Sequence, residues 1–226
     1  MTTITNKKYE EHSQIELIEA ALTDAKNRSS LIPTTALEIP GMSGILYRAF
    51  INNYIRKLEK PRYLELGSFT GSTLCAAIGG IHNVEALAVD NFSYDGSSLT
   101  KCRENVESVR GINANINVID YRFEDFDFSA HGKFNVYMYD AGHTEEDHYN
   151  AIVRAVPALD EISLIIIDDW NDHNGEVSHI KTGTYNGFAD TNLEILYKIE
   201  IETGVNPPFP SEWHNGYGIF LVRNKG

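Results

Sequence analysis

The chain has 226 residues, a length that suits one domain built around one hydrophobic core. Hydrophobic residues make up 42% of it and charged residues 23%, which is ordinary for a soluble globular protein. The formal net charge is −13 and no basic stripe is present, so a nucleic-acid partner is not expected, whereas a small, cationic or metal-held substrate fits the charge.

The chain begins MTTITNKKYEEHSQ, and no apolar run follows the basic pair, so we predict no secretory signal. The apolar run Leu164–Ile167 is far too short to span a bilayer. Cys75 and Cys102 stand in predicted helices without a CxxC pattern or a histidine at metal spacing, so we expect free thiols. These features predict a cytoplasmic protein without a membrane partner.

The first sixty residues are predicted to be helical. Apolar residues recur at helical spacing over residues 9–30 and again over 43–58, and Pro61 ends the second helix. We interpret residues 1–60 as a separate helical segment that serves either as a lid or as a subunit contact in a homo-oligomer. The sequence does not decide between these two roles.

From residue 61 onward, short apolar runs alternate with helical patterns, which predicts an open α/β sheet with helices on both faces. The last two strands have no helix between them, so we expect a hairpin with an antiparallel last strand. We therefore predict that residues 61–226 form a Rossmann-like, doubly wound sheet of seven mostly parallel strands. The predicted strands are 63–66, 85–89, 116–119, 136–139, 162–167, 193–201 and 217–222, and the helices are 71–78, 96–109, 144–159 and a weaker one at 176–188.

The carboxyl ends of the strands are where such sheets bind ligands. The first strand runs into YLELGSFTGST, in which Gly67 permits a sharp turn and Gly71 opens a helix whose free N–H groups favour an anionic group. A G-x-G-x-x-G fingerprint is absent, which argues against an NAD-type or FAD-type oxidoreductase. The second strand ends at Asp90, an acid that can bind both ribose hydroxyls, and Phe92 could stack on an adenine.

YLELGSFTGST resembles motif I of the class I S-adenosylmethionine-dependent methyltransferases, and in particular that of the catechol-type O-methyltransferases. The rest of residues 60–226 resembles the small-molecule O-methyltransferases grouped with macrocin O-methyltransferase. The resemblance implies a methionine site at the glycine turn, a ribose site at the second strand and an adenine site after the third. The implied cofactor contacts are Glu65, Gly67, Phe69, Gly71, Ser72, Asp90, Asn91, Phe92, Phe123, Glu124 and Asp140.

Three acids follow two further strands. Asp140 ends the fourth strand, and Asp168 with Asp169 ends the fifth, so neighbouring strands would bring the three together. Clustered carboxylates repel one another unless protons or a cation intervene, and hard oxygen ligands suit Mg²⁺ or another divalent cation. The resembling families hold a divalent ion at these positions, where it lowers the pKa of the hydroxyl to be methylated. Alternatively, Asp168 and Asp169 only cap the next turn.

His143 and Asp140 are the predicted catalytic residues. The resembling catechol-type enzymes carry a lysine proposed as the base where this chain has His143, and a histidine with a pKa of about 6.5 can accept a hydroxyl proton. His148 and His173 are alternative bases, and His143 could instead bond to backbone at the helix start.

The acceptor pocket is predicted to be walled by residues after the fifth strand and in the C-terminal hairpin loop, 206–218. We assign substrate contacts to Trp170, Asn171, Trp213 and His214, with Asn215 and Tyr217 nearby. The alternative for this loop is a rigid turn with a surface aromatic.

The predicted activity is metal-assisted methylation of a hydroxyl group on a small molecule such as a sugar, a phenol or another natural product. Three alternatives stay open: a metal-independent N- or C-methyltransferase, a non-catalytic S-adenosylmethionine-binding module, and an NAD-type oxidoreductase. The triple-acid pattern favours oxygen as the acceptor, because a metal ion activates hydroxyls more readily than amines.

Overall fold

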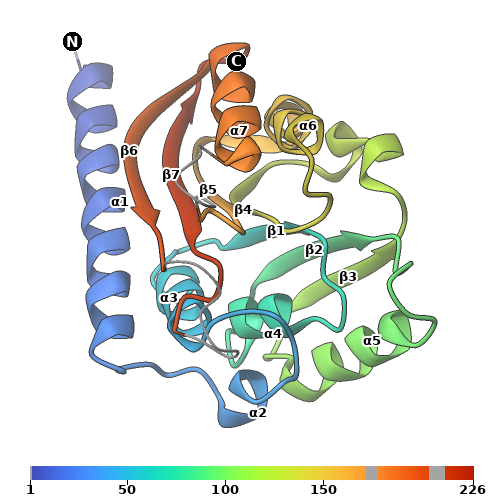
Figure 1. The fold of residues 1–226 in the computed structure, drawn as a ribbon. Helices are drawn as coiled ribbons and strands as arrows, with labels where there is room; N and C mark the ends of the chain where they lie inside the picture. Colours follow the sequence, from blue (N-terminus) through green and yellow to red (C-terminus); the bar gives the residue numbers. More distant parts are fainter. Residues whose placement is uncertain (1, 172–177, 204–211) are drawn as a thin grey trace.

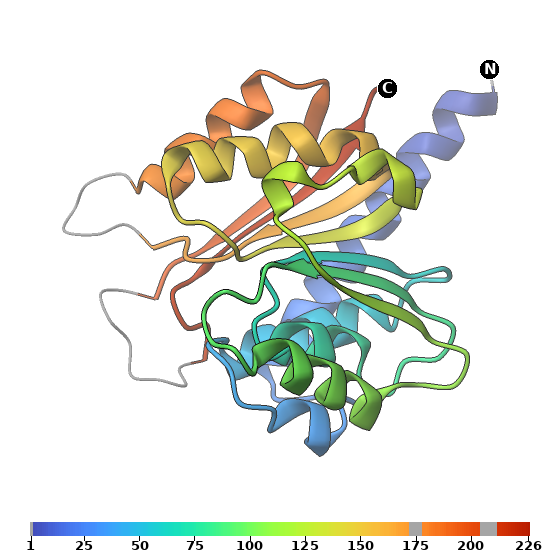
Figure 2. The same cartoon turned by 90° about the vertical axis from the view of Figure 1, so that its right-hand side faces the viewer.

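The computed structural model describes residues 2–171, 178–203 and 212–226. Its centre is a seven-stranded sheet in the order β3-β2-β1-β4-β5-β7-β6, with β7 antiparallel to both of its neighbours. Helices cover both faces of this sheet (Figures 1 and 2). The prediction of a doubly wound, mostly parallel sheet with an antiparallel last strand is confirmed. The strands are β1 (Arg62–Leu66), β2 (Glu85–Asp90), β3 (Asn115–Asp120), β4 (Phe134–Tyr139), β5 (Leu159–Ile167), β6 (Leu193–Ile201) and β7 (Tyr217–Asn224).

Two helix layers enclose the sheet. One face packs against α1, α3, α4 and α5, and the other against α6, α7 and the 3-10 turns that follow β3. Figure 2 shows α6 and α7 on one side of the sheet and α4 and α5 on the other. The helices are α1 (Thr2–Lys26), α2 (Thr34–Leu37), α3 (Ile45–Ile55), α4 (Ser72–Ile78), α5 (Ser98–Val109), α6 (Glu145–Ala155) and α7 (His179–Ala189), and the 3-10 turns are η1 (Phe123–Asp125), η2 (Phe128–His131) and η3 (Val156–Ala158).

Helix boundaries differ from the sequence prediction at several ends. The first helix ends at Lys26 rather than 30, and α3 is shorter at both ends than the predicted 43–58. A proline in η3 ends the regular part of α6 at Ala155, after which β5 begins three residues earlier than predicted. The predicted start of the last helix, at residue 176, lies outside the described residues.

The N-terminal helices and the sheet share one core. Every residue of α3 except Ile45 is buried, and apolar residues of α1 belong to the same cluster as those of α4 and α5. Tyr197 of β6 donates a hydrogen bond of 3.0 Å to Glu19 of α1, and Arg223 of β7 pairs with Glu11. The side of the sheet formed by β6 and β7 is therefore covered by α1 (Figure 1). The role of residues 1–60 as a lid or a subunit contact stays a prediction.

None of the described helices is both long and apolar enough to cross a membrane.

Candidate active site

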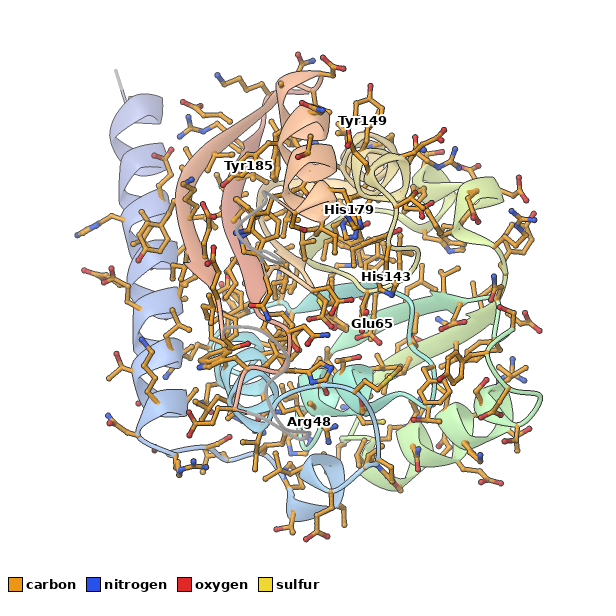
Figure 3. The ribbon with its side chains drawn as sticks, in the orientation of Figure 1. Arg48, Glu65, His143, Tyr149, His179 and Tyr185 are labelled. Atoms are coloured by element: carbon orange, nitrogen blue, oxygen red, sulfur yellow. The ribbon has the colours of Figure 1, made fainter. Side chains whose placement is uncertain are left out.

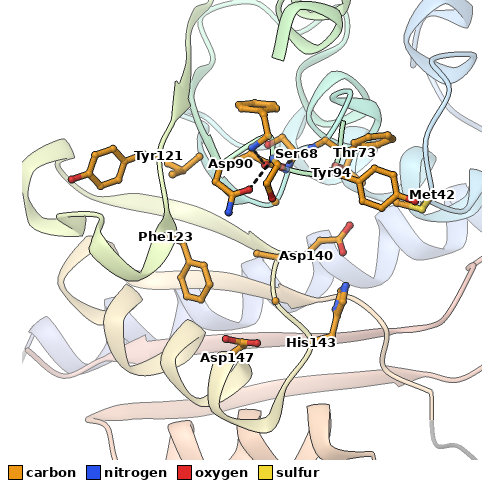
Figure 4. A pocket seen from close by; sticks show the side chains of 18 of the residues that line it. Met42, Ser68, Thr73, Asp90, Tyr94, Tyr121, Phe123, Asp140, His143 and Asp147 are labelled. Carbon is orange, nitrogen blue, oxygen red and sulfur yellow. Dashed lines mark hydrogen bonds between the residues drawn. The ribbon is translucent and has the colours of Figure 1, made fainter. Parts of the chain in front are cut away.

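A cavity of about 390 Å³ opens at the carboxyl ends of β1, β2 and β4 (Figure 4). This is the edge of the sheet at which α/β folds bind ligands. Most of the predicted cofactor residues line it. They are Gly67, Phe69, Ser72, Asp90, Asn91, Phe92, Phe123, Glu124 and Asp140.

The turn after β1 approaches β4 backbone to backbone. Gly67 has φ +84°, and a Cβ placed there would lie 1.8 Å from the carbonyl oxygen of Asp140. No side chain fits at this point, so glycine is required both for the conformation and for the close approach. Gly71 also has φ +84° and precedes α4, but it does not line the cavity.

Asp90 holds the glycine turn in place. Its Oδ2 accepts hydrogen bonds from the main-chain N–H groups of Ser68 (2.7 Å) and Phe69 (2.8 Å), and its Oδ1 accepts one from Phe92 (2.6 Å). Phe69 and Phe92 adopt left-handed conformations, with φ of 48° and 47°. Strained backbone of this kind persists where surrounding contacts enforce it, and it clusters at ligand sites. Asp90 thus fixes both strained residues at the cavity wall.

Glu65 lies outside the cavity lining. It is fully buried, where it accepts hydrogen bonds from Tyr63 Oη (2.5 Å) and Thr73 Oγ1 (3.0 Å). Burial raises the pKa of Glu65 to about 7. Strand alternation explains the placement, because Tyr63 and Glu65 point to one face of the sheet while Leu64 and Leu66 pack on the other. Its role is therefore to support the turn from beneath, without contact with the cavity.

The acids after β4 and β5 lie together because these two strands are parallel neighbours. Tyr139 pairs with Ile167 in the register, so the next residue of each strand, Asp140 and Asp168, leaves the sheet at the same level. The carboxylate of Asp168 is buried, and its Oδ1 has no hydrogen-bond partner among the described residues. An unpaired buried carboxylate oxygen is costly unless a proton or a cation meets it.

Asp140, His143 and Asp169 form a group of potential metal ligands. One ligand atom from each lies within 4.8 Å of the other two. His143 Nδ1 is 3.3 Å from Asp169 Oδ2, and Asn215 Nδ2 donates a hydrogen bond of 2.7 Å to Asp169 Oδ1. Figure 4 shows Asp140 and His143 side by side at the cavity. Asp168, Asp140 and Asp169 thus converge as the sequence predicts, with His143 beside them.

Charge crowding perturbs this acid cluster. Burial, followed by the charges of Asp168 and Asp169, raises the pKa of Asp140 well above its ordinary value. Burial and the charge of Asp169 raise the pKa of Asp168 in the same direction. Both carboxyls therefore hold protons more tightly than free aspartate does, and a bound cation would reverse this effect.

The other candidate bases are placed less favourably than His143. His148 is buried against Tyr139, neither of its ring nitrogens has a hydrogen-bond partner among the described residues, and burial lowers its pKa to about 3. His143 is half exposed, and its main-chain carbonyl contacts His179 Nε2 at 2.7 Å (Figure 3). His173 lies outside the described residues.

The four predicted acceptor contacts do not line the cavity. Trp170 is fully buried against aromatic rings of α7 and β7, and Trp213 is buried against α3. Asn171 is buried and bonded to Thr203, and His214 is partly buried nearby. Asp169 adopts a left-handed backbone conformation, with φ 56°. The next residue, Trp170, packs on the α6/α7 side of the sheet. The tryptophans therefore form core, a correction to their assignment as pocket walls.

Several lining residues were not predicted from the sequence. Asp147 belongs to a capping box with Thr144 at the start of α6, a pattern that the sequence does carry. Met42 lies in the segment before α3, where no local pattern indicates contact with a turn thirty residues away. The remaining unpredicted lining residues are Ser68, Thr73, Val89, Ser93, Tyr94, Tyr121, Ala141 and Gly142. His143, which the sequence analysis predicts as the base, also lines the cavity.

Comparison with known proteins agrees with this geometry. Residues 64–170 match the family model of a methyltransferase domain. An O-methyltransferase from Bacillus cereus, crystallised in complex with SAH, superposes with a TM-score of 0.57 at 12% identity, covering 92% of this chain and 91% of that one. A candidate O-methyltransferase from Klebsiella pneumoniae gives 0.54 at 13% identity, covering 92% and 90%.

A candidate SAM-dependent methyltransferase from Streptococcus mutans gives a TM-score of 0.53 at 18% identity, covering 79% of this chain. The match covers 49% of that protein, so this chain spans about half its length. No curated protein sequence matches the chain. The sheet order and the solved structures define the class I methyltransferase fold. Within this fold, residues 64–170, just under half of the chain, are the part that matches the methyltransferase-domain model.

Proposed function

We propose that the protein is an S-adenosylmethionine-dependent methyltransferase that methylates a hydroxyl group of a small molecule with the help of a divalent cation. The observation that carries the proposal is the junction of two sites at one sheet edge. The cavity over the glycine turn adjoins the cluster of Asp140, His143 and Asp169. Two members of this cluster, Asp140 and His143, also line the cavity.

The cavity suits the cofactor in size and in polarity. Its volume of about 390 Å³ lies within the range of about 300–1,000 Å³ that small-molecule sites occupy. The methionine portion fits over Gly67 and Ser72, and the adenine fits between the aromatic residues after β3. Asp90 already accepts three main-chain bonds, which leaves about one of its four lone-pair positions for a ribose hydroxyl. The SAH-bound B. cereus relative supports this arrangement.

The acid cluster fits a divalent cation. Asp140, Asp168 and Asp169 supply hard oxygen ligands, and the partnerless oxygen of Asp168 is a position at which a cation would offset the cost of burial. Such an ion, when bound, makes an acceptor hydroxyl more acidic and orients its oxygen. Asn215 fixes one oxygen of Asp169, so the cluster does not depend on the cation for its shape.

His143 is placed to remove the acceptor proton. Its Nδ1 faces Asp169, which favours the tautomer with hydrogen on Nδ1 and leaves Nε2 free to accept a proton. S-adenosylmethionine, when bound, would supply a methyl group on a sulfonium and leave as a neutral thioether as the acceptor oxygen takes the methyl carbon. His143 would receive the hydroxyl proton that the acceptor gives up. Orientation of the two reactants supplies most of the acceleration.

The decisive experiment separates cofactor binding from catalysis. Calorimetric titration should show SAH binding and no NAD binding in wild type, and both wild type and Asp168→Ala should retain SAH. Transfer of labelled methyl from S-adenosylmethionine to a panel of phenols and sugars should require Mg²⁺, stop in chelator and be lost in Asp168→Ala. Absence of SAH binding refutes the cofactor assignment, and full activity of Asp168→Ala in chelator refutes the metal assignment.

A further inference from the structure

The segment before α3 lies against the glycine turn. We call residues 37–43 the strap. Thr70 Oγ1 donates a hydrogen bond of 2.8 Å to the carbonyl of Pro40, and Ser43 Oγ is 3.3 Å from Ser72 Oγ. A Cβ added to Gly41 would lie 2.0 Å from Ser72 Oγ. The strap therefore touches the same turn that lines the cofactor cavity, and it adds Met42 to that lining.

A buried guanidinium organises the strap. Arg48 of α3 is only 5% exposed, and among the described residues it forms no ion pair with a carboxylate. Its Nη1 donates to the carbonyls of Leu37 (2.8 Å) and Ile39 (2.7 Å), and its Nε donates to Ser43 Oγ (2.8 Å). A longer contact of 3.4 Å joins Nη2 to the carbonyl of Gly41. Figure 3 shows Arg48 close to α2.

The energetics make this arrangement specific. A buried charge is costly unless hydrogen bonds replace its hydration, and here all of the replacements given above come from the strap. Arginine alone among the side chains presents a rigid fork that can meet several carbonyls at once. The strap conformation and the burial of the guanidinium therefore depend on each other. Ser43 connects Arg48 to the glycine turn, because its Oγ accepts a hydrogen bond from Arg48 and also contacts Ser72 Oγ.

We propose that Arg48 is a positioning residue that fixes the strap against the glycine turn and so shapes the methionine end of the cofactor cavity. The proposal deepens the proposed function and rests on it for the identity of the ligand. Arg48 itself does not line the cavity, so it acts through Ser43, Gly41 and Met42.

Arg56 offers a matched control. It directly follows α3 and also donates to main-chain carbonyls, those of Gly79 and Gly80 (3.1 Å each), but it does not contact the strap. Arg48→Met and Arg56→Met both remove an arginine that bonds main-chain carbonyls, and Arg56 is the less buried of the two. A purely structural role predicts a loss of stability without a specific loss of SAH binding, whereas the positioning role predicts weaker SAH binding for Arg48→Met alone.

The first measurement is SAH affinity by calorimetry. We expect Arg48→Met to weaken SAH binding about tenfold, Arg48→Lys to recover part of the loss, and Arg56→Met to stay within about twofold. Gly41→Ala places a Cβ 2.0 Å from Ser72 Oγ, which forces the strap away from Ser72 while the side chain of Arg48 is retained, and it should weaken binding as Arg48→Met does. Equal effects of Arg48→Met and Arg56→Met would overturn the proposal.

The second measurement needs no ligand. Amide hydrogen exchange should rise in both the strap and residues 67–72 of Arg48→Met, and in neither segment of Arg56→Met. If wild type fails to bind SAH, the proposed function fails while the exchange data still decide whether Arg48 couples strap and turn. Should Arg48→Met not fold, Ser43→Ala replaces it, because it cuts the link to Ser72 and keeps the carbonyl bonds. Unchanged exchange in residues 67–72 of Ser43→Ala would then refute the coupling.

Discussion

The two corners of the active-site edge are built on opposite principles. At the corner after β1 and β2, Asp90 is satisfied by three main-chain N–H groups and the turn is locked. At the corner after β4 and β5, three carboxylates face one another and Asp168 Oδ1 has no partner among the described residues. The first corner is complete without a ligand, whereas the crowded acids of the second hold protons more tightly than free aspartate does.

The first corner is preorganised for a ligand, whereas the second is destabilised by repulsion between neighbouring acids. A locked turn binds a ligand without the cost of ordering its own backbone, which suits a cofactor that must be held reproducibly. Crowded carboxylates raise the free energy of the unliganded protein, so a cation that binds there is stabilising in proportion. Substitutions at the two corners should therefore change stability in opposite directions.

The largest effect is expected from Asp168→Asn. Loss of one charged ligand should lower methyl transfer by about a hundredfold, because the cation is weakly held and the acceptor is misplaced. In chelator the same variant should be more stable than wild type by about 1 kcal/mol, since a buried repulsion is relieved. Urea unfolding in EDTA and in Mg²⁺ measures the free energy of unfolding of the metal-free and the metal-bound protein.

Asp160→Asn is the control for that variant, because Asp160 is an exposed acid at the opposite end of β5. It should change neither activity nor stability beyond about 0.5 kcal/mol. If Asp168→Asn is less stable than wild type in chelator, repulsion between the acids does not destabilise the metal-free protein.

Asp90→Ala should have the opposite sign for stability. It leaves three main-chain N–H groups without their acceptor and frees two strained residues, so the free energy of unfolding should fall by about 3 kcal/mol. SAH binding should be lost with it, as calorimetry can show. Asp120→Ala, at the end of the neighbouring strand β3, provides the comparison and should leave both properties intact.

Glu65 gives a pH-dependent test of the support beneath the turn. Its pKa of about 7 in the folded protein exceeds the ordinary value of 4.5, so the native state keeps its proton longer than the unfolded chain does. Below pH 4.5 Glu65 is protonated in both the folded and the unfolded protein, so its burial does not oppose folding through a charge. As the pH rises toward 7, stability falls by about 3 kcal/mol in total.

Glu65→Gln should remove that decline. The stability of the variant relative to wild type should increase from pH 5 to pH 8, as urea unfolding at the two values would report. A difference that stays the same at both pH values would mean that Glu65 titrates normally, and its size would reflect only altered hydrogen bonds with Tyr63 and Thr73.

The smallest effect is expected at Asn215, which holds Asp169 from the C-terminal hairpin. Asn215→Ala should lower turnover about fivefold through a less well oriented carboxylate, with SAH affinity unchanged. Asn113→Ala, on an exposed loop, should be silent in both assays. Loss of SAH affinity in Asn215→Ala would show that the two corners are not independent.

The sequence predicted what depends on local pattern and regular geometry. Strand and helix alternation defined the sheet, and the convergence of Asp140 with Asp168 followed from parallel neighbours in register. Contacts between distant segments escaped prediction. Nothing in the sequence near Met42 or Arg48 indicates that this segment contacts the glycine turn. The side of the sheet on which Trp170 is buried depends on the left-handed conformation of Asp169. Alternation along β1 could have shown that Glu65 points away from the cavity.

The contact between Gly67 and the carbonyl of Asp140 has a consequence for how such a protein can diversify. The turn that lines the cavity meets the end of β4 there as two stretches of peptide, and no side chain intervenes. Residues of the cavity wall could be exchanged during evolution or by engineering while the spacing of these two segments stayed the same. New acceptors can then be sought by altering the walls alone, provided that this one position remains glycine.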